Sequence, residues 1–105
     1  MADKTIDMGD YQVLADVRMP ECSLRTLQLS PGKEVNLHVH HMTTQVYFVI
    51  EGEAIANMAG KSKKLGPMQS LRVPVNTPHG ISTETTATVL SISIPPLRAD
   101  DLTVV

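Results

Sequence analysis

The sequence is short of several residue types, and each shortage excludes a class of protein. Its 105 residues contain one cysteine, no tryptophan, one phenylalanine and two tyrosines. The single cysteine, Cys22, cannot form an internal disulfide, so a reducing compartment is expected. No apolar run reaches the length of a membrane span, and residues 1–11 lack the apolar segment of a signal peptide. We therefore expect a cytoplasmic protein.

Excess charge is also missing. The formal net charge is −2, which gives no electrostatic reason to expect a nucleic acid or an anionic membrane as a partner. A small molecule is the expected ligand. The length suits one domain that spans residues 1–105.

Helical periodicity is absent as well, and short strand-like segments take its place. Residues 59–62 are expected to form a polar turn, and residues 99–102 a short helical turn or a loose tail. The segments that read as strands, bounded by Pro, Gly or polar turn residues, are 11–14, 17–19, 22–30, 35–40, 45–50, 53–58, 70–73, 79–82 and 87–94. Many short strands at close spacing predict an all-β antiparallel sandwich or barrel.

Three of the four histidines lie in one stretch, residues 32–52. His38 and His40 are two residues apart, so on a strand both side chains point to one face. Gln45 begins the returning strand and can lie beside His40 on that face. Two imidazoles and an amide then converge, and His79 is the histidine that can complete a metal site. His41 has the opposite parity and is expected to face outward or to cap the turn.

A two-residue turn at residues 51–52 would pair the strand 45–50 with the strand 53–58. The pairs that would share the histidine face are Val49 with Ala54, Tyr47 with Ala56, and Gln45 with Met58. The two alanines would leave space for a small ligand. Tyr47 would either offer its hydroxyl to the ligand or only pack the interior, and Met58 would line the site.

The opposite face of this pair of strands is apolar too, with Val46, Phe48, Ile50 and Ile55. A strand that is apolar on both faces is covered on both, and 105 residues leave little chain to cover the second. We therefore predict a homodimer that buries this face.

The central stretch resembles motif 1 of the cupin superfamily, G-x5-H-x-H-x3,4-E-x6-G. Gly32, His38, His40, Gln45 and Gly52 fit every spacing, and only Gln45 departs, because the family has Glu there. The resemblance implies a small jelly-roll barrel, the double-stranded β-helix, with a metal ion inside.

The second cupin motif, G-x5-P-x-G-x2-H-x3-N, is matched more loosely. Pro74 and His79 fit, whereas Met68 and Asn76 stand at the two Gly positions and Thr83 at the Asn position. Together the two motifs imply His38, His40, Gln45 and His79 as the metal ligands. Gln45 could instead bind the water of the metal ion.

The Gln in place of Glu changes the expected chemistry. Three imidazoles and an amide leave the charge of a divalent ion uncompensated, which favours Zn²⁺, Ni²⁺, Co²⁺ or Cu²⁺, with Fe²⁺ or Mn²⁺ possible. Such a centre polarises a bound carbonyl strongly and attracts anions. Arg25 and Arg72 could bind an anionic substrate or could be solvated strand residues.

Two functional classes follow from this site. The first is a small metalloenzyme that acts on an oxygen-rich or carbonyl-bearing molecule by isomerisation, cyclisation, lyase chemistry or dioxygenation. The second is a non-catalytic metal-dependent module that binds or senses a small molecule. The sequence offers few candidates for a general base, since Glu34 and the turn residues are the only carboxylates near motif 1 at ligand parity.

Overall fold

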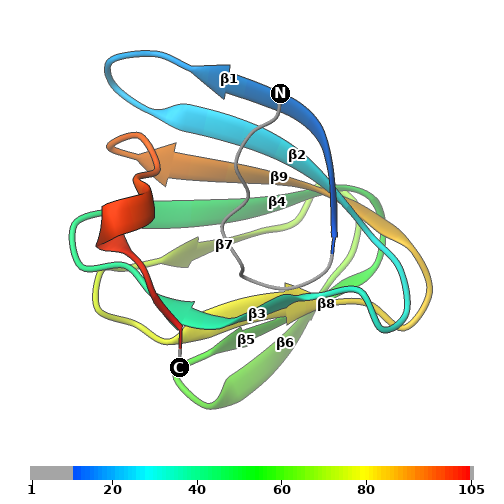
Figure 1. Ribbon diagram of the computed structural model, residues 1–105. Helices are drawn as coiled ribbons and strands as arrows, with labels where there is room; N and C mark the ends of the chain where they lie inside the picture. The colour runs from blue at the N-terminus through cyan, green and yellow to red at the C-terminus, as the bar shows by residue number, and fades with distance from the viewer. Residues whose placement is uncertain (1–10, 105) are drawn as a thin grey trace.

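The computed structural model describes residues 11–104, which form ten strands and one short 3-10 turn (Figure 1). The elements in chain order are β1 (Gln12–Arg18), β2 (Ser23–Leu29), β3 (Val35–Val39), β4 (Thr44–Gly52), β5 (Ala54–Met58), β6 (Lys61–Leu65), β7 (Ser70–Val73), β8 (His79–Ser82), β9 (Ala87–Ile94), η1 (Ala99–Asp101) and β10 (Thr103–Val104). No helix of the described part is long and apolar enough to cross a membrane.

The strands form two five-stranded antiparallel sheets that face each other. One has the order β1-β2-β9-β4-β7 and the other the order β10-β3-β8-β5-β6 (Figure 1). Buried and half-buried residues alternate along β4, as the two-residue period of a strand requires. The inward side chains of both sheets form the core, which includes Leu29, Val49, Leu65 and Val89. The predicted all-β jelly-roll architecture, a double-stranded β-helix, is confirmed.

Several strand limits agree with the sequence prediction. The strands β7, β8 and β9 have the predicted bounds, and η1 lies within the turn expected at residues 99–102. By contrast, β1 is one strand where two were expected, because an irregularity between Val13 and Ala15 lets its pairing with β2 continue. Residues 61–62, expected in a turn, begin β6 at the edge of its sheet.

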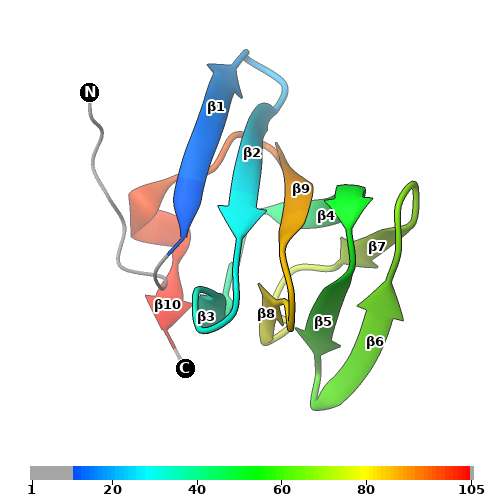
Figure 2. The same cartoon turned by 90° about the vertical axis from the view of Figure 1, so that its right-hand side faces the viewer.

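The predicted hairpin of residues 45–50 with residues 53–58 is wrong. β4 pairs with β7 and β9, whereas β5 pairs with β6 and β8 in the other sheet. Figure 2 shows the chain passing from β4 in one sheet to β5 in the other. The passage occurs at Gly52, where φ is +77° and a Cβ atom would overlap the carbonyl oxygen of Thr86.

The cross-strand contacts deduced from that hairpin are therefore wrong as well. Gln45 is not a strand neighbour of His40, and Tyr47 is not paired with Ala56. The predicted interior positions still hold, because the inner faces of the two sheets enclose one core. Tyr47 is 2% exposed and Ala56 1% exposed.

A bulge in β3 changes which side chains face inward. The register with β8 shifts between Val35 and His38, so both side chains are buried, whereas the sequence placed them on opposite faces. Leu37, which a regular strand would place on the same face as Val35, is 45% exposed. Gly80 of β8 makes room for the bulge, since a Cβ there would lie 2.7 Å from the carbonyl oxygen of Val35.

Candidate metal centre

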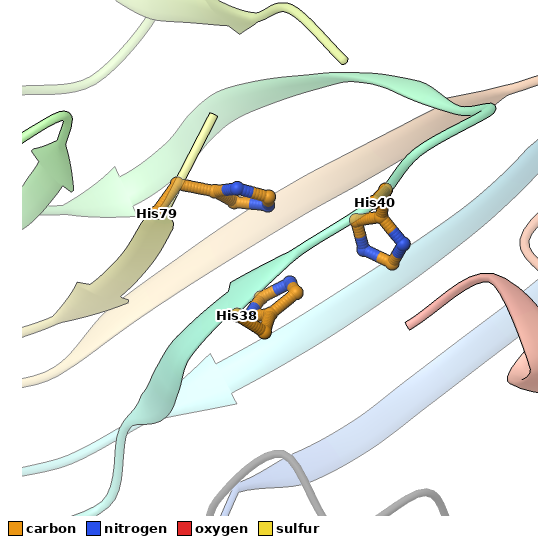
Figure 3. A group of neighbouring side chains, drawn as sticks. All are labelled: His38, His40 and His79. Atoms are coloured by element: carbon orange, nitrogen blue, oxygen red, sulfur yellow. The ribbon is translucent and has the colours of Figure 1, made fainter. Parts of the chain in front are cut away.

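Three histidines meet inside the sandwich. His38 comes from β3, His40 directly follows that strand, and His79 begins β8 as the strand partner of His38. Each is 1% exposed, and their candidate ligand atoms all lie within 4.8 Å of one another. Figure 3 shows the three rings gathered around a common space. The predicted convergence of these side chains is confirmed.

The backbone fixes the tautomer of all three rings. Each Nδ1 lies within hydrogen-bond distance of a carbonyl oxygen, which can only accept. The pairs are His38 with Asn36 at 2.7 Å, His40 with Asp101 at 2.9 Å, and His79 with Thr77 at 2.8 Å. Each Nδ1 therefore carries the hydrogen, and each Nε2 presents a lone pair to the cluster.

Nε2 of His40 is buried and has no hydrogen-bond partner in the described part of the chain. Leaving a buried acceptor without a partner costs about 1–3 kcal/mol. Imidazole nitrogens held by a backbone carbonyl at the opposite ring nitrogen are typical ligands of Zn²⁺ and similar ions. The three histidines could therefore hold a metal ion, and a cation there would satisfy the unpartnered atom.

Gln45 approaches the cluster from β4 in the opposite sheet and is 4% exposed. Its Nε2 donates to Oγ of Ser93 at 2.9 Å, which turns Oε1 toward Nε2 of His79 at 2.8 Å. Because Nδ1 of His79 carries the hydrogen, two acceptors then face each other. A cation shared by the two atoms would remove this conflict. Ligation by Gln45 stays a prediction that this arrangement supports.

Burial keeps the cluster neutral. Desolvation lowers the pKa of His79 to about 4, with the charge of His38 acting in the same direction. Desolvation is also the main reason why the pKa values of His38 and His40 lie below their usual range. The three rings are therefore unprotonated at neutral pH, which is the form that binds metal ions.

Asp101 of η1 is a buried carboxylate that the sequence analysis missed. Its Oδ1 accepts the backbone N–H groups of His41 at 2.8 Å and Met42 at 3.0 Å, while its carbonyl oxygen accepts from Nδ1 of His40. Burial would raise the pKa of Asp101, but these hydrogen bonds outweigh it and lower that pKa. Asp101 thus positions His40 across 61 residues of sequence, and no local pattern reveals such a contact.

The four glycine positions of the two motifs share one backbone feature. Gly32 and Gly52 have φ values of 79° and 77°, and Met68 and Asn76, which replace the glycines of the second motif, have 69° and 60°. This left-handed region favours glycine. The second motif therefore persists in the backbone although the residue types have changed. The N–H of Asn76 donates to the carbonyl oxygen of His40, so the turn helps to hold the cluster.

His41 is exposed, as predicted, and its Nδ1 lies 2.8 Å from Oδ1 of Asn76. Its side chain is not part of the buried cluster. Its backbone N–H donates to Oδ1 of Asp101.

A cavity of about 20 Å³ adjoins the cluster, and it is lined by Tyr11, Arg25, Leu27, Val35, His38, Gln45, Tyr47, Ser91 and Leu97. Tyr47 is thus beside the candidate ligands, and its ring centroid lies 6.0 Å from that of His79. Burial raises the pKa of the Tyr47 phenol, so this group keeps its proton at neutral pH and can donate a hydrogen bond.

Of the other candidate site residues, Arg25 lines the cavity beside the histidine cluster, whereas Met58 and Arg72 do not. Met58 is the strand partner of His79 but lines another cavity, with Lys61 and Leu71 among its neighbours. The side chain of Arg25 is 18% exposed and lines the cavity beside His38. Arg72 is exposed and stays a solvated strand residue.

Two antiparallel sheets that enclose a cluster of three histidines define a double-stranded β-helix protein with a candidate metal centre. The sequence matches the family described as "Cupin domain" over residues 25–94, two thirds of the chain. The chain belongs to this family, as motif 1 indicated. Among curated proteins, none matches its sequence.

Solved structures share this fold at low sequence identity. TT1209 from Thermus thermophilus is 22% identical, with a TM-score of 0.77 over 84% of this chain and 86% of that one. KdgF from Halomonas sp. is 20% identical, with a TM-score of 0.74 over 93% and 87%. A protein with a double-stranded β-helix domain from Klebsiella pneumoniae is 18% identical, with a TM-score of 0.73 over 97% and 88%. These similarities establish the architecture.

Proposed function

We propose that this protein is a metal-dependent enzyme that acts on a small, oxygen-rich or carbonyl-bearing molecule. The observation that carries the proposal is the convergence of three buried Nε2 lone pairs, one of them unpartnered among the described residues. His38, His40 and His79 would hold the ion, and Gln45 would supply a fourth ligand. A divalent ion bound there would act as a Lewis acid that polarises a carbonyl oxygen.

The residues around the cluster define what the protein itself would contribute. Tyr47 keeps its proton because burial raises its pKa, so it would donate a hydrogen bond to a substrate oxygen. The apolar side chains of Leu27 and Val35 would exclude water from one side of the cavity. Isomerisation, cyclisation, lyase chemistry or dioxygenation are the reaction types compatible with these groups.

The neutral charge of the four ligand side chains also determines which metal ions are favoured. Three imidazoles and an amide favour Zn²⁺, Ni²⁺, Co²⁺ or Cu²⁺, and they are compatible with Fe²⁺ or Mn²⁺. Protein purified without added metal should contain about one equivalent of such an ion, and a His38→Gln variant should contain almost none. Near-stoichiometric iron together with substrate-dependent uptake of oxygen would replace the Lewis-acid proposal by a redox one.

A second candidate function is metal-dependent binding without catalysis. It is supported by the absence of any Asp or Glu among the described residues that line the cavity, because carboxylates are common general bases. Protein loaded with Co²⁺ distinguishes a reactive site from a structural one. If acetohydroxamate changes the visible spectrum, a small ligand reaches the ion, as catalysis or ligand binding requires. A spectrum that no ligand changes would indicate a closed, structural site.

We also propose that two copies of the chain associate through the outer face of β2, β9 and β4. Two cross-strand pairs, Leu90 with Phe48 and Ile92 with Val46, lie side by side there, and these side chains are only half-buried. Ile55, predicted on this face, lies in the other sheet. Because the centre of the face is uncharged, the same patch on two copies can pack around a twofold axis without repulsion.

A further inference from the structure

The cavity beside the histidine cluster has one charged wall. Of the described residues that line it, Arg25 alone carries a charge at neutral pH, since burial keeps His38 neutral. No Asp or Glu of the described chain lines the cavity, although Asp16, outside the lining, forms an ion pair with Arg25. The cavity wall therefore presents a cation whose partner carboxylate lies outside the cavity.

The sheet register explains why this side chain reaches the interior. Arg25 of β2 pairs with Ser91 of β9, and Ser91 pairs with Tyr47 of β4. Residues paired across a sheet point to the same face, and both Ser91 and Tyr47 are buried. Two strand spacings separate Arg25 from Tyr47, about 10 Å between Cα atoms. Arg25, Tyr47 and His38 of the histidine cluster therefore border one cavity.

Asp16 of the edge strand β1 is the cross-strand partner of Arg25 and holds its guanidinium. Nε of Arg25 donates to Oδ2 of Asp16 at 3.2 Å, and the side chain of Asp16 is 37% exposed against 18% for Arg25. A guanidinium carries five N–H donors, so this ion pair and a hydrogen bond with the Tyr11 phenol orient the planar group and leave further donors for a ligand. Such a held guanidinium binds a carboxylate through two parallel hydrogen bonds.

Resting on the proposed function, we infer that Arg25 determines substrate specificity by binding a carboxylate of the substrate, and that the substrates are small carboxylates bearing a second oxygen function. The second oxygen would face the histidine cluster and the hydroxyl of Tyr47. The volume of the cavity, about 20 Å³, leaves room for a group the size of a water molecule or two, which a planar carboxylate can replace.

Pyruvate and its neutral amide, pyruvamide, test this inference because they differ only in the charged group. Binding to the Co²⁺-loaded protein is followed through its visible spectrum. Pyruvate should bind at least about tenfold more tightly than pyruvamide, as a charge-assisted hydrogen bond requires. Arg25→Gln should remove most of this preference, leaving only the attraction of the ion for an anion, and should leave the Co²⁺ content unchanged. Arg25→Lys should keep part of it, and Arg72→Gln, on an exposed strand position, should keep all of it.

The ion pair also suggests a variant that should increase the affinity for pyruvate. Asp16→Asn keeps a side-chain oxygen that can accept from Nε of Arg25 but removes the competing negative charge, so pyruvate should bind more tightly than to the wild type. The same comparison made by NMR on metal-free protein keeps the role of the arginine separate from that of the metal. If the protein binds no metal but Arg25→Gln still abolishes the preference for pyruvate, the proposed enzyme fails and the anion site stands. An unchanged preference in Arg25→Gln, or no preference in the wild type, would overturn the inference.

Discussion

Acid should destabilise the metal-free protein mainly through His79. Its pKa is lowered from 6.5 to about 4 in the folded state, so below pH 6.5 the unfolded chain binds a proton that the folded chain does not. The free energy of unfolding therefore falls as the pH decreases from 6.5 to about 4, and it falls no further from this group below that window. A difference of about 2.5 pKa units corresponds to about 3 kcal/mol at 1.36 kcal/mol per unit.

Urea unfolding in the presence of a chelator measures this loss at pH 7, 5.5 and 4. The lowered pKa values of His38 and His40 act in the same direction. Between pH 7 and pH 4 the free energy of unfolding of the wild type should therefore fall by at least the contribution of His79. A His79→Gln variant cannot titrate at this position, so its loss should be smaller by about 3 kcal/mol. The stability that depends on the lowered pKa of Asp101 is lost only at lower pH, below its usual value of 3.8.

A bound metal ion should protect the protein from this loss, since protons and the metal compete for the same nitrogen atoms. Two results would refute the reasoning. One is an unfolding free energy of the metal-free wild type that is the same at pH 7 and pH 4. The other is an NMR titration that places the pKa of His79 at or above 6.5, because the ring would then be stabilised as a cation by its surroundings.

Three further variants test separate parts of the structure. Asp101→Ala removes the side-chain oxygens that accept the N–H groups of His41 and Met42, so it should weaken metal binding about 10- to 100-fold in a chelator competition, as loss of a group that orients a ligand does, while Asp100→Ala on the exposed side of the same turn should not. Met68→Gly should raise the unfolding free energy by up to about 1 kcal/mol in urea, since Met68 is 71% exposed and has a φ of 69°. Phe48→Asp should convert a dimer into a monomer in sedimentation velocity by placing two charges at the proposed interface.

Each of these predictions can fail in a definite way. Equal metal affinity of Asp101→Ala and the wild type would show that the loop keeps His40 in place without the carboxylate. A loss of stability in Met68→Gly would mean that its side chain contributes more by packing than its backbone costs. A wild type that sediments as a monomer at micromolar concentration would exclude the proposed interface.

The histidine cluster was predictable because its geometry depends on local spacing. His38 and His40 share a face through the alternation of one strand, and the bulge of β3 precedes them, so it does not separate them. The placement of His79 came from elimination, as the remaining histidine, and from the second cupin motif. The bounds of β9 were predictable for a local reason too, since the polar turn residues 83–86 precede it and Pro95 and Pro96 follow it.

The pairing of β4 and β5 was not predictable, because the turn residues Glu51 and Gly52 suit a hairpin as well as a passage between sheets. The choice depends on β9, which pairs with β4 across the whole strand and comes about 40 residues later in the sequence. The role of Asp101 was hidden for a related reason. Its contacts with the loop at His41 join segments 60 residues apart, and no local period records them.

The central claim is that three histidines present unprotonated Nε2 atoms to a single metal ion. A proton–nitrogen correlation spectrum of the imidazole rings, recorded while Zn²⁺ is added to metal-free protein, tests it most directly. We predict that His38, His40 and His79 carry the hydrogen on Nδ1 before the addition, that their Nε2 resonances shift together and reach their end point at an equimolar amount of Zn²⁺, and that His41 does not respond. A hydrogen on Nε2 of any of the three rings, or resonances that Zn²⁺ leaves unchanged, would contradict the account.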